Sequence, residues 1–144
     1  MGKSNNWKKV EYKVARLLGG VKVPVSGRAG AMKGDVLHDK YFIEVKTGKQ
    51  IPKRIVEWYE ELKKYKYDKL LVFEFSIPKT VMRWYNKALE ECPKGKRVLL
   101  VMKPRYCHDE LVLWKPPYTT YFYFTTLKIF AKMIGGEDEY VGGY

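Results

Sequence analysis

The chain has 144 residues, the size of a single folded domain, and its apolar content of 46% is enough for a hydrophobic core. It carries 28 Lys and Arg residues against 16 Asp and Glu, a net charge of +12. No segment approaches the roughly 20 apolar residues of a membrane span, and no signal-peptide core follows the basic N-terminus, which argues against a membrane or secreted protein. We therefore expect an intracellular, cytoplasmic protein.

Periodicity predicts alternating helices and strands along the chain. Ser4 can cap a first helix that Gly19 and Gly20 can end, and three later segments share its helical spacing of apolar residues. Helices are expected over residues 4–18, 51–67, 76–92 and 126–134, and strands over 21–25, 35–37, 41–46, 70–75, 98–102, 111–114 and 121–124. The second and third strands form a hairpin that turns at residues 38–40.

This order of elements predicts an α/β domain in which helices flank a mixed β-sheet. We expect one domain over residues 1–134, closed by a helix that ends at Gly135 and Gly136. The acidic segment 135–144 is expected to be a flexible tail.

Basic charge is concentrated in the body of the chain. The last ten residues hold Glu137, Asp138 and Glu139 and no Lys or Arg, so the first 134 residues hold 28 basic and 13 acidic residues, a net of +15. Such an excess attracts a polyanion, most simply nucleic acid, although a basic surface that serves only solubility is an alternative. Scarce Gln and Asn beside abundant Lys, Glu and Tyr favour a thermophilic source.

The two cysteines, Cys92 and Cys107, form no CxxC pair. His108 follows Cys107, but a zinc site would need two further ligands. We therefore expect two reduced, buried thiols and neither a disulfide nor a zinc site.

The strand YFIEVKT carries the first candidate site residues. Because strand side chains alternate between two faces, Glu44 and Lys46 point to the same side. The carboxylate can hold a hard divalent cation, and the ammonium can orient water or neutralise the charge that develops during phosphodiester hydrolysis. The same pattern suits the solvated face of an edge strand, which would give the pair no chemical role.

Two further carboxylates add to this pair. Asp35 begins the preceding strand, so the hairpin can bring it beside Glu44, where the two repel unless a cation lies between them. Glu11 lies within the apolar stripe of the first helix, and an inward carboxylate needs a partner. A metal shared with Asp35 and Glu44 would supply one. The structural alternatives are a salt bridge for Glu11 and an ordinary Gly-Asp turn for Asp35.

The segment SGRAGAMKG, residues 26–34, is a glycine-rich basic loop. Its glycines allow backbone to approach a phosphate, and Arg28 and Lys33 supply positive charge. Lys49, beyond the EVK strand, could also contact a DNA backbone. An ordinary hairpin loop is the alternative. We interpret His38 as a turn residue rather than a general base.

The succession of Glu11, GDV with Asp35, and EVK with Glu44 and Lys46 resembles the PD-(D/E)xK nuclease superfamily. Its members have a helix that carries Glu, then a hairpin that carries Asp and the (D/E)xK strand, so the resemblance implies a restriction-endonuclease-like core. Gly34 stands where the motif has Pro. Within the superfamily, VPVSGRAGAMKGDV and FIEVKTGK resemble archaeal and phage Holliday-junction resolvases, over residues 10–49.

This resemblance implies a homodimeric endodeoxyribonuclease that cuts four-way DNA junctions with Mg²⁺, or with Mn²⁺ in its place. The implied oxygen ligands come from the helix, the hairpin and one backbone carbonyl: Glu11, Asp35, Glu44 and Val45. Lys46 would orient or activate water, and Ser26 would act beside the scissile phosphate. The implied DNA contacts are Ser26, Arg28, Lys33 and Lys49.

Several questions stay open from the sequence. A restriction-type or repair nuclease would use the same chemistry on other DNA, and a basic DNA-binding protein could keep the fold without catalysis. The segment 50–77 is longer than a minimal resolvase needs. Apolar residues of the segment 111–130 are expected to supply a surface for a two-fold dimer.

Overall fold

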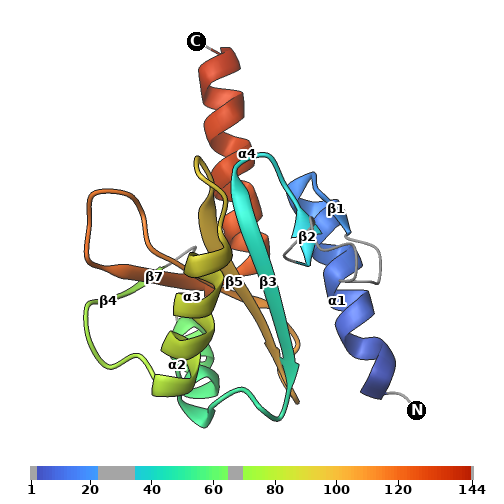
Figure 1. Cartoon of the computed structure of the whole chain (residues 1–144), viewed down its shortest axis with the longest axis vertical. Coiled ribbons are helices and arrows are strands. Elements are labelled where there is room, and N and C mark those ends of the chain that lie inside the picture. Colours follow the sequence, from blue (N-terminus) through green and yellow to red (C-terminus); the bar gives the residue numbers. More distant parts are fainter. Residues whose placement is uncertain (1–2, 23–34, 65–69, 144) are drawn as a thin grey trace.

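The computed structural model describes the backbone of residues 3–22, 35–64 and 70–143, and the side chains of 7–20, 35–64 and 70–135. The described strands form one mixed sheet of seven strands between two helical layers (Figure 1). The helices are α1 (Lys3–Leu18), α2 (Lys53–Lys63), α3 (Lys79–Glu91) and α4 (Leu127–Gly143). The strands are β1 (Val21–Lys22), β2 (Val36–Leu37), β3 (Tyr41–Gly48), β4 (Leu71–Phe73), β5 (Arg97–Pro104), β6 (Leu111–Trp114) and β7 (Phe122–Thr126).

The strand order across the sheet is β1-β2-β3-β5-β6-β7-β4. Strands β3 and β5 run parallel along their full length, and every other described pair is antiparallel. A parallel pair needs a long crossover, and here the crossover contains α2, β4 and α3. The expected α/β domain with a mixed sheet is therefore confirmed, and β3 is an interior strand.

Side-chain alternation along β3 and β5 divides the core between the two faces of the sheet. Phe42, Val98 and Leu100 pack with α2 and α3 on one face. Ile43 and Val45 pack with α1 and α4 on the other. Glu44 and Lys46 share the parity of Phe42, so they lie on the face that α2 and α3 cover.

The hairpin between β2 and β3 is attached to the end of α1. The His38 Nε2 atom lies 2.9 Å from the Leu18 carbonyl oxygen, to which it donates, and the Lys40 backbone N–H donates to His38 Nδ1 at 3.0 Å. The histidine thus satisfies one of the last carbonyls of the helix, which have no partner within it. His38 is a turn residue, as its position in the sequence predicted.

Several element boundaries differ from those predicted, and the largest differences are at three helices. Helix α3 begins at Lys79 after Pro78, because Ser76 has a φ of 75° and no side-chain hydrogen bond caps the helix. Helix α2 ends at Lys63, and Lys64 follows it as the C-cap residue. Helix α4 continues to Gly143. Glycine weakens a helix by about 1 kcal/mol per residue but ends it only where a C-cap forms.

Most apolar side chains of residues 111–130, where a dimer surface was expected, are buried within this chain, whereas Tyr118 and Tyr121 are exposed. The buried ones are the four side chains of β6, Phe122 and Phe124 of β7, and Leu127 and Phe130 of α4. Strand β6 pairs on both edges and is covered on both faces, so it has no apolar surface left to offer. The dimer surface itself stays a prediction.

Gly20 lets β2 approach the end of α1 closely. A Cβ atom at this position would collide with the backbone carbonyl of Leu37, which cannot rotate away. We predict that Gly20→Ala destabilises the protein by about 1–3 kcal/mol through overpacking. Gly135→Ala, where a Cβ meets open space, should be neutral or slightly stabilising. Urea unfolding of both variants measures the difference, and equal stability would contradict the close approach.

Candidate active site

Asp35 is bound to the side of β3 by two hydrogen bonds. Its backbone N–H donates to the Ile43 carbonyl at 2.9 Å, and the Val45 backbone N–H donates to Asp35 Oδ2 at 2.8 Å. Strand β2 begins only at Val36. The Asp35 carboxylate therefore accepts the Val45 N–H, which a backbone carbonyl would accept if β2 extended further. The hairpin therefore fixes one carboxylate beside the middle of β3.

Glu44 is the neighbour of Val45 on β3 and is half-buried. Burial raises its pKa from the ordinary value of 4.5 to about 7, and the negative charge of Asp35 contributes to the increase. Lys46 lowers the pKa, Glu91 raises it, and Lys87 lowers it. The two carboxylates therefore interact electrostatically, and this agrees with the closeness of Asp35 and Glu44 that the hairpin predicted. This proximity is the condition under which a bound cation becomes favourable.

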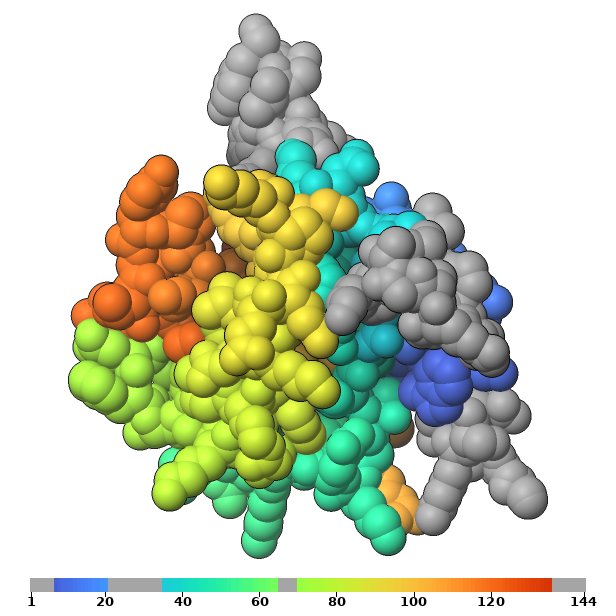
Figure 2. All heavy atoms as spheres, in the orientation of Figure 1, coloured from blue at the N-terminus to red at the C-terminus, as the bar shows by residue number. Residues whose placement is uncertain are grey.

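Helix α3 supplies neighbours of this pair that sequence reasoning missed. The Lys46 Nζ atom lies 5.4 Å from the centre of the Trp84 ring, a cation–π distance. Lys87 and Glu91 follow on α3 and act on Glu44 through their charges. The amphipathic pattern of α3 predicts a covering helix but not which strand residue each side chain meets. In Figure 2, α3 (yellow) lies beside the teal atoms of the β3 region.

Glu11 is buried, at 5% exposure, and takes part in a polar or electrostatic interaction of its own. Helix α1 packs on the face of Ile43 and Val45, opposite to Glu44. On the helix, Glu11 lies on the flank of the buried stripe away from Lys9 and Lys13. Among the described residues, no three Asp, Glu, His or Cys side chains are grouped closely enough to hold a metal. The structure thus brings together Asp35 and Glu44, and a ligand role for Glu11 stays a prediction.

The remaining predicted site residues divide into two groups. Ser26, Arg28 and Lys33 lie outside the described residues. Lys49 is exposed just after β3 and lines a cavity on the α1 side of the sheet.

The donor chemistry of the hairpin suits a hard divalent cation. Such cations take oxygen ligands, and the hairpin provides two carboxylates, Asp35 just before β2 and Glu44 within β3. In a β-strand, the C=O and the N–H of one residue point toward the same neighbouring strand. Because the Val45 N–H points to Asp35, the Val45 carbonyl lies on the Asp35 side as well. These three residues therefore fit Mg²⁺ as a donor set.

Comparison with known proteins identifies no relative. No family model, curated protein or solved structure matches the chain. In the part of the chain that the structure describes, no helix is long and apolar enough to cross a membrane. Inference about function therefore rests on the chemistry of the residues.

The raised pKa of Glu44 predicts a pH-dependent stability. Between pH values of about 4.5 and 7 the folded state binds more protons than the unfolded state, so stability falls as pH rises through that range. Gln carries no charge to desolvate. The advantage of Glu44→Gln over the wild type should therefore grow by about 2 kcal/mol between roughly pH 5 and pH 8, allowing for solvent screening. Urea unfolding in EDTA measures this, and an advantage that is independent of pH would contradict it.

Proposed function

We propose that this protein is a Mg²⁺-dependent endodeoxyribonuclease with a restriction-endonuclease-like core. The observation that carries the proposal is the carboxylate pair: the Val45 N–H holds Asp35 at 2.8 Å beside the strand that presents Glu44 and Lys46. The solvated edge-strand alternative does not apply to that strand, because β3 pairs with β2 and β5. A half-buried Glu and Lys on an interior strand therefore need another explanation.

The arrangement of elements supports the resemblance to PD-(D/E)xK nucleases. Helix α1 carries Glu11, and the hairpin of β2 and β3 follows with Asp35 and the EVK sequence. The order and the strand pairing agree with the core that the resemblance implies. The charge of +12 supports a nucleic-acid substrate.

Each side chain has a role in phosphodiester hydrolysis. Asp35, Glu44 and the Val45 carbonyl would hold Mg²⁺, and Glu11 would add a ligand if its side chain turns to the same point. When bound, the cation polarises the phosphate and lowers the pKa of a bound water. The Lys46 ammonium, which lies 5.4 Å from the centre of the Trp84 ring, would orient the attacking water or offset charge on the phosphate. Half-burial of Glu44 strengthens these charge interactions by limiting access of solvent.

Substitution of the strand residues tests the chemistry. Glu44→Gln removes a charged ligand and should abolish cleavage, while DNA binding survives or tightens because repulsion of phosphate falls. Lys46→Ala removes an oriented donor and should lower turnover by about 10²–10³ with little loss of binding. Cleavage of labelled plasmid and oligonucleotide DNA with Mg²⁺, and with EDTA as the blank, measures both effects.

Lys132→Ala is the matched control, since Lys132 is exposed on α4, which packs on the face of the sheet opposite to Glu44. It should cleave at the wild-type rate. Glu11→Gln decides the remaining ligand: normal Mg²⁺-dependent activity would remove Glu11 from the site. Near-normal turnover in Lys46→Ala would make that lysine a surface charge. DNA binding by the wild type with no cleavage under any condition would favour a non-catalytic DNA-binding protein.

We further propose that the substrate is a four-way junction and that the active form is a two-fold dimer. A junction has two strands to cut symmetrically, and one domain of this size offers one carboxylate pair. The β4 end of the sheet supports association, because β4 is paired only with β7 in the described sheet and Val72 and Phe75 are 51% and 75% exposed there. An unpaired edge with apolar side chains favours contact with a second copy.

Phe75→Glu should convert the dimer to a monomer, because it places a charge in the apolar contact. The fraction of four-way junctions cut in both of the paired strands should then fall, while cleavage of one strand at a time persists. Leu89→Glu is the control, since Leu89 is 52% exposed on α3, away from β4. Sedimentation and junction cleavage measure the two properties. A monomeric wild type, or equal cleavage of junction and linear duplex, would defeat the resolvase assignment and leave the nuclease.

A further inference from the structure

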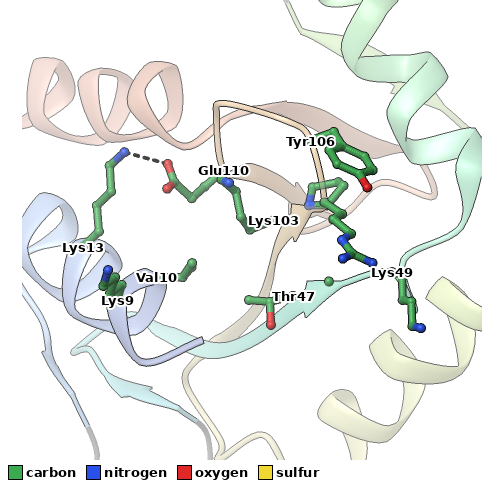
Figure 3. Close-up of a pocket in the computed structure, with 11 residues that line it drawn as sticks. Lys9, Val10, Lys13, Thr47, Lys49, Lys103, Tyr106 and Glu110 are labelled. Carbon is green, nitrogen blue, oxygen red and sulfur yellow. Dashed lines mark ion pairs between the residues drawn. The ribbon is translucent and has the colours of Figure 1, made fainter. Parts of the chain in front are cut away.

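A second site lies at the carboxyl-terminal ends of the parallel strands β3 and β5. The cavity has a volume of about 480 Å³, within the range of small-molecule sites. Helix α1 forms one wall, and the turn after β5 forms the other (Figure 3). Thr47 belongs to the lining and is three residues past Glu44, roughly 10 Å along the strand.

The cavity is strongly basic. Its cations come from three separate parts of the chain: Lys9, Lys13, Lys49, Lys103 and Arg105. Glu110 is the one acidic residue of the lining, and Lys13 forms an ion pair with it at 2.9 Å, so five positive and one negative charge leave a net of +4. Figure 3 shows Lys9 and Lys13 on α1, with Lys49 and Lys103 at the strand ends. Cations spread over three elements suit successive negative charges rather than one small anion.

An exposed aromatic residue stands at the rim. Tyr106 is 91% exposed and belongs to the cavity lining. Its φ of 71° lies in the left-handed region, which costs a non-glycine residue of order 1 kcal/mol. The Cys107 N–H donates to the Pro104 carbonyl at 3.2 Å and closes this turn. The Arg105 guanidinium lies 5.5 Å from the Tyr106 ring, so a cation and an aromatic face are presented together.

We infer that this cavity binds an unpaired segment of a nucleic-acid strand. The lysines contact its phosphates, and Tyr106 provides a face on which one base stacks. Basic grooves with an exposed aromatic residue bind single strands in this way, whereas a paired base in a duplex offers no free face. The inference deepens the proposed function and rests on it for the identity of the strand as DNA. It assigns a contact for unpaired nucleotides that flank the cleavage site.

The binding test uses a fluorescein-labelled oligo-dT of about 12 nucleotides in EDTA, so that no cleavage is needed. Fluorescence anisotropy should show binding by the full chain. The double variant Lys49→Glu and Lys103→Glu should raise the Kd at least tenfold at about 0.1 M salt. The slope of log K against log salt should fall by about 1.4, because two phosphate contacts are lost. Tyr106→Ala should raise the Kd about fivefold or more, and Tyr106→Phe should restore binding.

The control reverses two exposed charges elsewhere, Lys94→Glu and Lys132→Glu. It should change the Kd by less than about threefold. Equal losses in the two double variants would overturn the inference, because binding would then depend on diffuse charge. Binding of a duplex of the same length that falls as much as that of oligo-dT in Tyr106→Ala, or thymidine monophosphate that competes as well as the oligomer, would also overturn it.

Circular dichroism spectra confirm that each variant is folded. The outcomes distinguish a failure of the cavity proposal from a failure of the nuclease proposal. Oligo-dT binding that depends on Lys49, Lys103 and Tyr106 in a protein that cleaves no DNA would sustain the cavity and defeat the nuclease. Mg²⁺-dependent cleavage with no selective loss in the cavity variants would do the opposite.

Discussion

The position of β3 in the sheet is the constraint on which the rest of the site depends. This strand pairs with β2 on one edge and with β5 on the other, and helices cover both of its faces. Its side chains must therefore alternate between two cores, and a shift of one residue would move Ile43 and Val45 out of contact with α1 and α4. The same alternation directs Glu44 and Lys46 toward α3. Core packing thus determines where the charged residues lie.

The free-energy cost of placing charged residues on this interior strand falls mainly on Glu44. Burial and the nearby Asp35 raise its pKa to about 7, so the ionised form is disfavoured in the folded protein. Two features keep the arrangement in place: the hydrogen bond from Val45 to Asp35 and the cation–π contact between Lys46 and Trp84. Carboxylates with perturbed pKa values cluster at functional sites, which is why this pair carries the proposed chemistry.

The parallel pairing of β3 and β5 has a second consequence. It brings the carboxyl-terminal ends of both strands to one edge of the sheet, where Lys49 and Lys103 meet the basic flank of α1. The crossover between the two strands places α3 over Glu44. One topological feature therefore produces both the charged surroundings of the carboxylates and the basic cavity at the strand ends.

The sequence by itself determined the α/β class, the mixed sheet, the hairpin and the closeness of Asp35 to Glu44, because these follow from local periodicity and from a short turn. It could not determine the neighbours Trp84, Lys87 and Glu91, the cavity around Tyr106, or the burial of most apolar side chains of residues 111–130 within one chain. Those depend on which strands become neighbours, and β3 meets β5 across nearly fifty residues of sequence. Long-range pairing is a property of the assembled core, and local patterns do not encode it.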